Sequence, residues 1–538
     1  MAFTEEQEAK LTKLLAAFEN GKRINELDPA VGELSAMQIE VMDETGETHR
    51  MELERAVSEA GNPIAGRWWN STNATTKAAG WFGSLEALKK LPETLGLGRY
   101  LVADDRTMRK LDPKDSRRFE DGSPAALDGT MGQCMWCWSR PWYFTRWSDG
   151  ERDKWAITLK PIPGKKSYRI PVGGVSWLDA AVMDRTEQKL CSVISEDERY
   201  RGGNGSARPG TDPKKPAANT PQASMLGMPA TVISTTNFGT YARKRGEGWE
   251  ANWFVARAAV EILITVIMGD RNIQAAYNPE RDADGLMQGG FGSGVTTMGW
   301  QEWSDYNGCY PLVPTNVGLE MGDGTGLVSY SLPASEGGDQ GTPYKTFQVP
   351  VFFGLVHAGY GHLWRWVRGL TINQEAGVKT EVYVAKSMTA AFNPNSIEGL
   401  KKVAECPQAE GYIKRVSYEG LCGMPTEVGG SPTTCFPDYF YTNGKTQTGL
   451  RVRAAGGHAD YGATAGAFCS TAGYAATNAI ANCSSLLYFA RYIKQNAIWA
   501  GPCHLAKDNK NAEGAGRSVR FRQFPKRAEQ TQTDPQTR

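Results

Sequence analysis

Few residues in this chain have the types and spacing that metal binding or acid–base catalysis requires. His357 and His362 stand five positions apart in VHAGYGHLW, whereas a helical metal pair stands four apart, and no third ligand is evident nearby. Glu302 and Asp305, in WQEWSDY, could be the acidic pair of a glycoside hydrolase. Paired carboxylates near tryptophan also occur in binding grooves and at solvated edges. We therefore expect neither a metal site nor an enzyme.

Other chemical motifs are incomplete. Cys134 and Cys137 form a C-x-x-C pair, but a structural zinc site needs a second pair at matching spacing, and the sequence has none. Buried free thiols in a reduced compartment are the simpler expectation. MGDGTG, around Asp323, could turn about a calcium ion, although a glycine turn explains it as well. The sequence predicts no cofactor.

Composition excludes several classes of function. The 538 residues include 60 basic and 59 acidic side chains, so the net charge is +1 and no basic field indicates a nucleic-acid partner. The first residues, MAFTEEQEAKLTKLL, are charged and lack the apolar core of a secretory signal. The run AAVEILITVIM is too short to span a bilayer and is interrupted by Glu261. We expect a protein made in a cytoplasm, without membrane insertion.

The hydrophobic pattern predicts the elements that must position any site. Residues 3–20 read as an amphipathic helix, and MQIEVMD and THRMELE read as a β-hairpin with its turn at residues 44–47. The next helix is expected before Gly61, and another lies within residues 62–98. The clearest helix falls at about 250–268 and ends at Gly269. Later segments such as KTEVYVAKS, LLYFARYI and SVRFRQF read as strands. The predicted class is α+β, mostly antiparallel, with one long helix.

One segment fits neither a helix nor a packed strand. RAAGGHADYGATAGAFCSTAGYAATNAIANCSS, at residues 453–485, alternates alanine and glycine with isolated polar and aromatic residues. Its side chains are too small to form an ordinary apolar helix face, and they also provide too little apolar bulk for a strand in a packed core.

An ordered set of segments resembles a known family. The set runs through RYLVADDRTMRKLDP, PAALDGTMGQCMWCW, NWFVARAAVEILITVIMGDRN, LVPTNVGLEMGDGTG and VPVFFGLVHAGYGHLWRWVRG to the glycine- and alanine-rich run. It resembles the C-type-lectin-like domains of tail and receptor-binding proteins from phages of gut Bacteroidetes. It is also similar to the variable proteins that diversity-generating retroelements target. The N-terminal hairpin region is similar to the modules that begin many phage tail proteins.

The resemblance implies a domain plan and a location. Residues 1–60 would be an N-terminal module for virion attachment and oligomerisation, and 61–98 a connector. Residues 99–525 would form a C-type-lectin-like domain, of the fold shared with formylglycine-generating enzymes, with a variable-like region at 448–485. Residues 526–538 would be a polar tail. The protein would be made in the host cytoplasm and reside in the virion tail, as a homotrimer joined to other tail proteins by its first module.

In such proteins the ligand-facing residues stand on a rigid frame, and glycine and alanine let the backbone pack closely around them. The resemblance therefore implies six receptor-contact residues: His458, Asp460, Tyr461, Phe468, Tyr474 and Asn478. Each of them could instead fill the interior of the domain.

A codon argument bears on the same region. Residues 448–492 contain no Lys, Glu, Gln, Met or Trp, although Met and Trp each occur 16 times in the chain. Asparagine codons that mutate only at adenine cannot reach those five residues, as expected for a retroelement-type variable region. A frame of small residues that excludes bulky side chains explains the absence equally well.

The sequence also departs from the lectin pattern. The acid–proline–acid tripeptide of calcium-dependent lectins is missing, and Cys469 and Cys483 do not match the reactive pair of the formylglycine-generating enzymes. We therefore expect neither calcium-dependent sugar binding nor oxidase activity. The resemblance instead implies a phage tail-fibre or receptor-binding protein that recognises a bacterial surface glycan or protein. The alternative is a structural virion component, such as a collar or head fibre, that does not bind the receptor directly.

Overall fold

The computed structural model describes residues 62–71, 75–208, 214–308, 311–388 and 392–491, and the backbone of two earlier strands. These strands, β1 (Gln38–Met42) and β2 (Thr48–Glu52), pair antiparallel with Gln38 opposite Glu52. The predicted N-terminal hairpin is thus confirmed as a strand pair. The helices expected at 3–20 and before Gly61, the strand in SVRFRQF and the tail at 526–538 lie outside the described residues.

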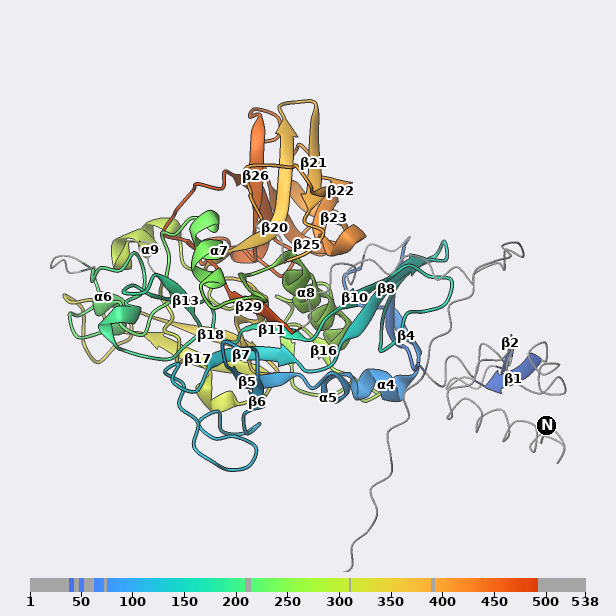
Figure 1. The fold of residues 1–538 in the computed structure, drawn as a ribbon, viewed down its shortest axis with the longest axis horizontal. Coiled ribbons are helices and arrows are strands. Elements are labelled where there is room, and N and C mark those ends of the chain that lie inside the picture. The colour runs from blue at the N-terminus through green and yellow to red at the C-terminus, as the bar shows by residue number, and fades with distance from the viewer. Residues whose placement is uncertain are drawn as a thin grey trace, which may run out of the picture. The chain divides into compact units, whose positions relative to one another are not determined.

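The regular secondary structure of the described residues is mostly β-strand, distributed over several sheets with short helices between them (Figure 1). The predicted α+β class with a single long helix, and the C-type-lectin-like fold with it, is therefore wrong. Glycine, proline and turn residues divide the chain into strands of mostly two to eight residues, which join different sheets rather than one domain sheet beside one helix. The helices are α4 (Leu85–Lys89), α5 (Leu91–Leu95), α6 (Pro221–Ser224), α7 (Thr235–Arg243), α8 (Phe254–Met268) and α9 (Trp300–Asn307).

The largest sheet has nine strands. Eight follow one path: β22 (Lys401–Glu405), β21 (Lys379–Val384), β20 (Trp364–Glu375), β26 (Gly449–Ala455), β27 (Ser470–Tyr474), β25 (Phe436–Tyr441), β23 (Gly411–Ser417) and β24 (Met424–Val428). The ninth, β28 (Cys483–Ser484), pairs in parallel with the start of β20. Pairing is otherwise antiparallel, except that β25 and β27 run parallel. The expected strand in KTEVYVAKS is β21.

A six-stranded sheet follows the order β14 (Trp249–Ala251), β29 (Leu487–Ala490), β11 (Gly173–Ser176), β7 (Gln133–Trp138), β5 (Gly98–Val102) and β6 (Met108–Lys110). The expected strand in LLYFARYI is β29, which pairs with both β14 and β11. All residues of β5, β7 and β11 are buried, as in a sheet covered on both faces.

A five-stranded sheet follows the order β10 (Ser167–Ile170), β8 (Trp142–Ser148), β9 (Arg152–Thr158), β3 (Ala65–Asn70) and β4 (Gly80–Gly83). Within the segment expected to be a connector, β3 and β4 join this sheet, and Trp69, Leu91 and Leu95 lie in the main hydrophobic core. Residues 62–98 are therefore an integral part of the folded body.

Smaller sheets and turns complete the described fold. The small sheets are β12 (Val182–Asp184) with β13 (Lys189–Cys191), β15 (Tyr277–Asn278) with β16 (Gln288–Gly289), and β17 (Gly326–Leu332) with β18 (Lys345–Phe352) and β19 (Leu355–Val356). Turns of 3-10 helix occupy Glu198–Tyr200, Leu319–Met321, His357–Gly359, Glu419–Leu421 and Gly462–Thr464.

Helix α8 lies where the sequence predicts a helix. No glycine or proline interrupts residues 254–268, and Gly269 ends the helix in the left-handed conformation, donating its N–H to the carbonyl of Thr265. All of its residues are buried, which is the pattern of a helix surrounded by protein. It contacts β11 and β20, so it touches both large sheets. Among the described residues, no helix combines the length and apolarity needed to cross a membrane.

Candidate functional site

The glycine- and alanine-rich segment 448–485 forms strands β26, β27 and β28 and the two loops between them. β26 lies between β20 and β27 inside the nine-stranded sheet. Its buried residues and those of β27 are part of the protein's interior. The loops at 456–469 and 475–482 contain the more exposed residues of the segment, including Ala463, Thr477 and Ala479. The strands thus fix the position of the segment, and its loops expose side chains to solvent.

Close backbone approach explains why the first loop has small residues. A Cβ atom at Gly466 would lie 1.9 Å from Oδ1 of Asp438, and one at Gly457 would lie 2.8 Å from the Cβ of Ala465. Ala459, Ala465 and Ala467 are almost completely buried. Larger side chains at these positions would force the backbones apart, so small residues are required for the loop to pack as it does.

Hydrogen bonds hold this first loop in place. Gly462 donates its N–H to the carbonyl of Thr296 at 2.6 Å, and Met298 donates to the carbonyl of Ala459 at 3.0 Å. The side-chain amide of Gln274 donates to the carbonyls of Gly462 and Ala465. Partners from separate parts of the chain therefore fix the loop backbone.

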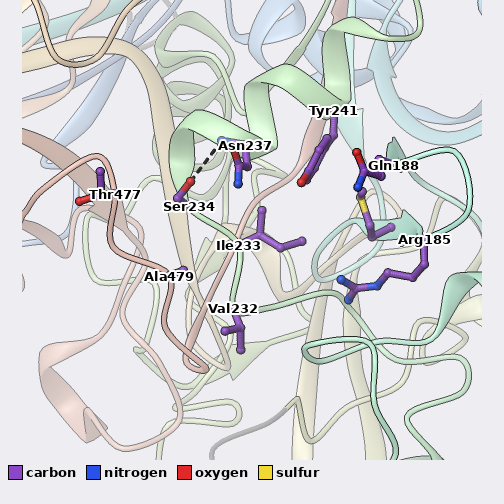
Figure 2. A pocket seen from close by; sticks show the side chains of 10 residues that line it. Arg185, Gln188, Val232, Ile233, Ser234, Asn237, Tyr241, Thr477 and Ala479 are labelled. Carbon is purple, nitrogen blue, oxygen red and sulfur yellow. Dashed lines mark hydrogen bonds between the residues drawn. The ribbon is translucent and has the colours of Figure 1, made fainter.

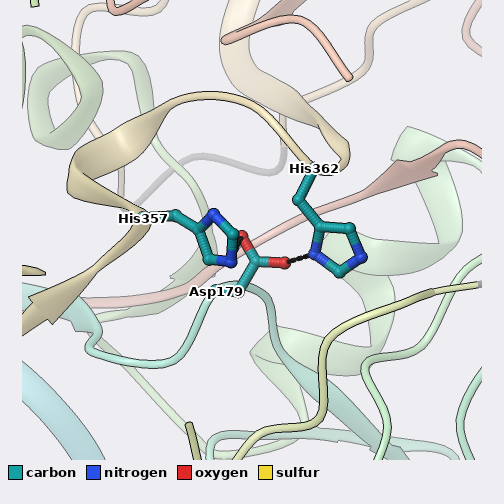
Figure 3. A group of neighbouring side chains, drawn as sticks. All are labelled: Asp179, His357 and His362. Carbon is teal, nitrogen blue, oxygen red and sulfur yellow. Dashed lines mark hydrogen bonds and ion pairs between the residues drawn. The ribbon is translucent and has the colours of Figure 1, made fainter. Parts of the chain in front are cut away.

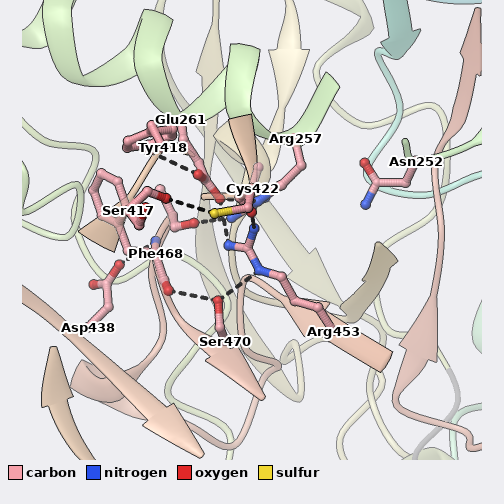
Figure 4. Close-up of polar contacts among 12 residues, drawn as sticks. Asn252, Arg257, Glu261, Ser417, Tyr418, Cys422, Asp438, Arg453, Phe468 and Ser470 are labelled. Atoms are coloured by element: carbon pink, nitrogen blue, oxygen red, sulfur yellow. Dashed lines mark hydrogen bonds and ion pairs between the residues drawn. The ribbon is translucent and has the colours of Figure 1, made fainter. Parts of the chain in front are cut away.

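A buried charged network ties the segment to α8 (Figure 4). Glu261 accepts hydrogen bonds from Arg257 and Arg453, both at 2.8 Å, and from the hydroxyl of Tyr418 at 3.0 Å. Arg453, on β26, also donates to the hydroxyl of Ser470 on β27 at 3.1 Å. Burying a charged group costs free energy unless the group is paired and hydrogen-bonded, as Glu261 is. The network therefore depends on all of its members.

Asp438 of β25 holds the far end of the first loop. Its carboxylate accepts the N–H of Phe468 at 2.7 Å, and Arg257 donates to the carbonyl of Ala467 nearby. Burial raises the pKa of Asp438 to about 8, so its carboxyl group is protonated at neutral pH. The loop end is thus fastened by a neutral carboxylic acid rather than by an ion pair.

Two of the six predicted receptor-contact residues lie in the interior. His458 is 3% exposed and lies between the rings of Trp303 and Tyr461, with centroids at 5.3 and 4.1 Å. Burial lowers its pKa to about 3, so the ring is neutral. Phe468 is 1% exposed and contacts the ring of Phe436 at 4.8 Å. For these two side chains the surface expectation is corrected, because packing encloses them completely.

The other four predicted residues, Asp460, Tyr461, Tyr474 and Asn478, are half-buried. Tyr461 contacts Trp364 at 5.3 Å, and Tyr474 contacts Trp366 at 5.4 Å. Asn478 accepts the N–H of Ala475 at 2.7 Å, which closes its turn. Tyr461, Tyr474 and Asn478 are therefore each held by a neighbour while partly open to solvent. The role of all four in receptor contact remains a prediction.

A hollow of about 300 Å³ lies between the second loop and the start of α7 (Figure 2). Arg185 is fixed at its edge by hydrogen bonds to the carbonyls of Arg201 and Gly203. The hollow is lined by Met183, Arg185, Gln188, Val232, Ile233, Ser234, Asn237, Tyr241, Thr477 and Ala479.

None of these lining residues was predicted from the sequence as a site residue. Asn237 and Tyr241 stand four apart on α7, so both lie on one helical face, and Ser234 is the helix N-cap. Those two local signals were available in the sequence. The approach of Thr477 to this helix was not, because more than 230 residues separate them.

His357 and His362, from which the sequence predicts no metal site, lie close together in the structure beside Asp179 (Figure 3). Nδ1 of His362 is hydrogen-bonded to Asp179, and Arg365 forms an ion pair with the same carboxylate. His357 lies 3.8 Å from that carboxylate and stacks on His362 at 5.3 Å. Burial lowers the pKa of His357 to about 3.

The hydrogen bonds of this cluster do not suit a metal ion. Nε2 of His362 accepts the N–H of Leu312 at 2.8 Å, so the ring proton must be on Nδ1, where it points at Asp179. A protonated nitrogen cannot bind a metal, and the guanidinium of Arg365 occupies the carboxylate. These bonds link the loop of Asp179 to the start of β20, whereas both ring nitrogens of His357 are buried without a hydrogen-bond partner in the described part of the chain.

The acidic pair expected of a hydrolase is also engaged. Glu302 forms an ion pair with Lys345 at 3.0 Å, and Asp305 forms one with Lys214 at 3.1 Å. Hydrogen bonds from Gln301 and Lys214 lower the pKa of Asp305. Each carboxylate thus has its own lysine partner, and the expectation that the chain is not an enzyme remains a prediction.

Eight cysteines lie in the described residues, and all are free thiols. Seven are buried, including Cys134 and Cys137 of the C-x-x-C pair, and Cys435 is half-buried. Burial raises the pKa of the Cys134 and Cys137 thiols, which disfavours the reactive thiolate. The expectation of buried free thiols is confirmed for these seven.

Comparisons with known proteins give distant similarity to solved structures. No protein-family model matches the chain, and no curated protein matches it. Among solved structures, the chain is similar to one titled "Major Tropism Determinant U1 Variant", at 12% sequence identity and a TM-score of 0.22. The alignment covers 74% of this chain and 72% of that chain. A TM-score of this size carries no argument about fold or activity, so the functional assignment depends on the site itself.

Proposed function

We propose that this protein is a receptor-binding protein of a phage virion, an adhesin that recognises a bacterial surface glycan or protein. Its recognition face consists of Asp460, Tyr461, Tyr474, Thr477 and Asn478. The observation that carries the proposal is the contrast within one short segment. Buried glycine, alanine and charged residues fix the backbone, while these five side chains remain half-buried or exposed, and Thr477 lines the hollow.

This arrangement suits binding for a thermodynamic reason. Side chains that are already ordered before contact lose little conformational entropy when a partner arrives. Tyrosine adds a large, rigid contact area with few rotatable bonds, and asparagine and threonine add adaptable hydrogen bonds. Tyr461 and Tyr474 are held against Trp364 and Trp366, so their positions are set in the free protein.

The location in the virion rests on the resemblance of the ordered segments to phage tail proteins. In this proposal the N-terminal module joins the chain to other tail proteins and to two further copies of itself. Each copy then needs only modest affinity, because several linked sites on one particle bind a cell surface with much greater avidity.

Cell binding by the full chain and two arginine variants tests the proposal. Thr477→Arg and Ala479→Arg place a bulky cation on exposed positions of the hollow, where it blocks access without entering the core. Val378→Arg, at a 66% exposed site in the β20–β21 turn, is the control. Labelled chain is mixed with a panel of gut Bacteroidetes strains, and bound protein is measured.

We expect strain-selective binding that both hollow variants reduce about tenfold or more, equivalent to about 1.4 kcal/mol, while the control variant binds normally. Equal binding by all versions would exclude this face as the site. Absence of binding to every strain would contradict the receptor-binding function and favour the structural virion component.

A further inference from the structure

A continuous row of tyrosine rings extends the recognition face onto neighbouring strands. This tyrosine row consists of Tyr412 on β23, Tyr439 and Tyr441 on β25, and Tyr461 in the first loop. Successive ring centroids are 5.2, 4.7 and 4.8 Å apart. All four side chains are half-buried. Only Tyr461 belongs to the segment 448–485, so the row is mostly outside it.

The row continues past the first loop towards α9. The Tyr461 ring contacts His458, which in turn lies 6.5 Å from the ring of Trp300. Trp300 is 50% exposed, and it is one of five large hydrophobic side chains that are exposed in the described residues. Trp300 therefore adds an exposed aromatic ring on the far side of His458, which is itself buried.

The sheet itself produces this row. On β25 the side chains of Phe436, Asp438 and Phe440 are buried, whereas those of Tyr439 and Tyr441 are half-exposed on the other face. Tyr412 is directly opposite Tyr439 in the antiparallel pairing of β23 and β25, so the two rings share a face. The strand pairing thus fixes the spacing of the rings before any ligand binds.

The surroundings of the row decide between classes of ligand. Lys414 and Arg415 of β23 both form ion pairs with Glu427, at 2.7 and 2.8 Å. Binding of nucleic acid would require cations for the phosphates, but both of these cations are already paired with Glu427. An added peptide strand would need an open sheet edge, whereas the row lies on a face. Polar groups adjoin the rings, such as exposed Glu410, which accepts the N–H of Thr442.

We infer that the tyrosine row binds a carbohydrate chain of the bacterial surface. Sugar rings have apolar C–H faces that stack on aromatic rings, and hydroxyl groups that bond to tyrosine hydroxyls, amides and carboxylates. A row of fixed rings therefore accommodates consecutive sugars. With Glu410 and Asp460 beside the row, a neutral chain fits better than a strongly anionic one. This inference rests on the proposed function and names the ligand class of that recognition face.

Binding to purified polysaccharide tests the inference. Capsular polysaccharide is isolated from a strain that the full chain binds, and affinity is measured by titration calorimetry. The variants are Tyr412→Leu and Tyr439→Leu, and the matched control is Tyr143→Leu, a half-buried tyrosine on β8 of another sheet. We expect each row variant to weaken binding about tenfold and the control to bind normally, with all three melting like the parent.

A second measurement covers the case in which a leucine variant does not fold. Saturation-transfer NMR on the unaltered chain should carry magnetisation from aromatic protons to the sugar C–H protons, because stacking brings them into contact. A chain that binds cells but shows neither polysaccharide affinity nor this transfer would overturn the inference and leave the proposed function intact. A chain that binds no cells would instead contradict the proposed function.

Discussion

The two faces of strand β25 show how one short sequence can serve two purposes. Phe436, Asp438 and Phe440 face a core that α8 and the Glu261 network complete, and all three are buried. Tyr439 and Tyr441 face the other way and are half-exposed. The core behind the first face contains the ion pairs of Glu261 with Arg257 and Arg453, and loss of one partner would leave a buried charge unpaired. The second is aromatic surface that nothing in the described residues fully covers.

If the proposed function holds, stability and recognition are separated on β25 by the direction of the side chains rather than by their position in the chain. Neighbouring residues on β25 alternate between the two roles, as the period of a strand requires. A substitution on the core face should therefore affect folding first. A substitution on the other face should affect binding while the fold survives.

The largest effect is expected from breaking the buried network. Glu261→Gln leaves the guanidinium groups of Arg257 and Arg453 without a carboxylate, which should lower the free energy of unfolding by about 4 kcal/mol. Chemical denaturation would measure it. Glu86→Gln is the control, because it breaks an exposed ion pair with Lys90 that should contribute little. Equal effects from both variants would show that burial of the pair does not matter.

A smaller, pH-dependent effect is expected at Asp438. Its pKa is about 8 in the folded protein, whereas the ordinary value is 3.8. Between pH 4 and pH 8, the folded state therefore keeps a proton on Asp438 that the unfolded state has lost. Stability from this group is complete below pH 4 and is lost as the pH rises to 8. Asp438→Asn cannot ionise and escapes that loss. Relative to the parent, the variant should gain about 3 kcal/mol between pH 5 and pH 7.

Melting curves across this pH range would measure the difference between the two proteins. A constant difference from pH 5 to pH 9 would mean that Asp438 ionises normally, and that the loop end is held by a carboxylate.

The smallest effect is expected at Glu302. Glu302→Gln removes a partly exposed ion pair with Lys345, so stability should change by less than about 1 kcal/mol and cell binding should not change. The measurement compares both properties with those of the parent. Cleavage of a surface glycan by the parent that this variant lacks would contradict the expectation that the chain is not an enzyme.

Local patterns predicted local elements well. A mainly apolar run without glycine or proline before Gly269 located α8, and strand-like patterns located β1, β2, β21 and β29. The assembly of these strands into several sheets was not predictable, because short strands of similar pattern do not reveal their partners. The fold expected from the resemblance was wrong for this reason.

The candidate site was likewise predictable only in its local features. Sequence composition identified the segment 448–485, and four of its six selected side chains are at least partly open to solvent. It could not show that His458 and Phe468 are enclosed, because the residues around them come from distant parts of the chain. The meeting of Asp179 with His362, 183 positions later, was hidden for the same reason.

The pairing of β29 between β14 and β11 has a consequence for how this protein could change. The segment 448–485 starts in one large sheet, and the chain that follows it is anchored at once in another. Both ends are therefore fixed in register, so the distance between them is set. Mutational drift or a designed library could exchange the outward side chains freely. Insertions and deletions within β26, β27 or β28 would shift the register of a strand and should be rejected, so changes of length are confined to the two loops between these strands.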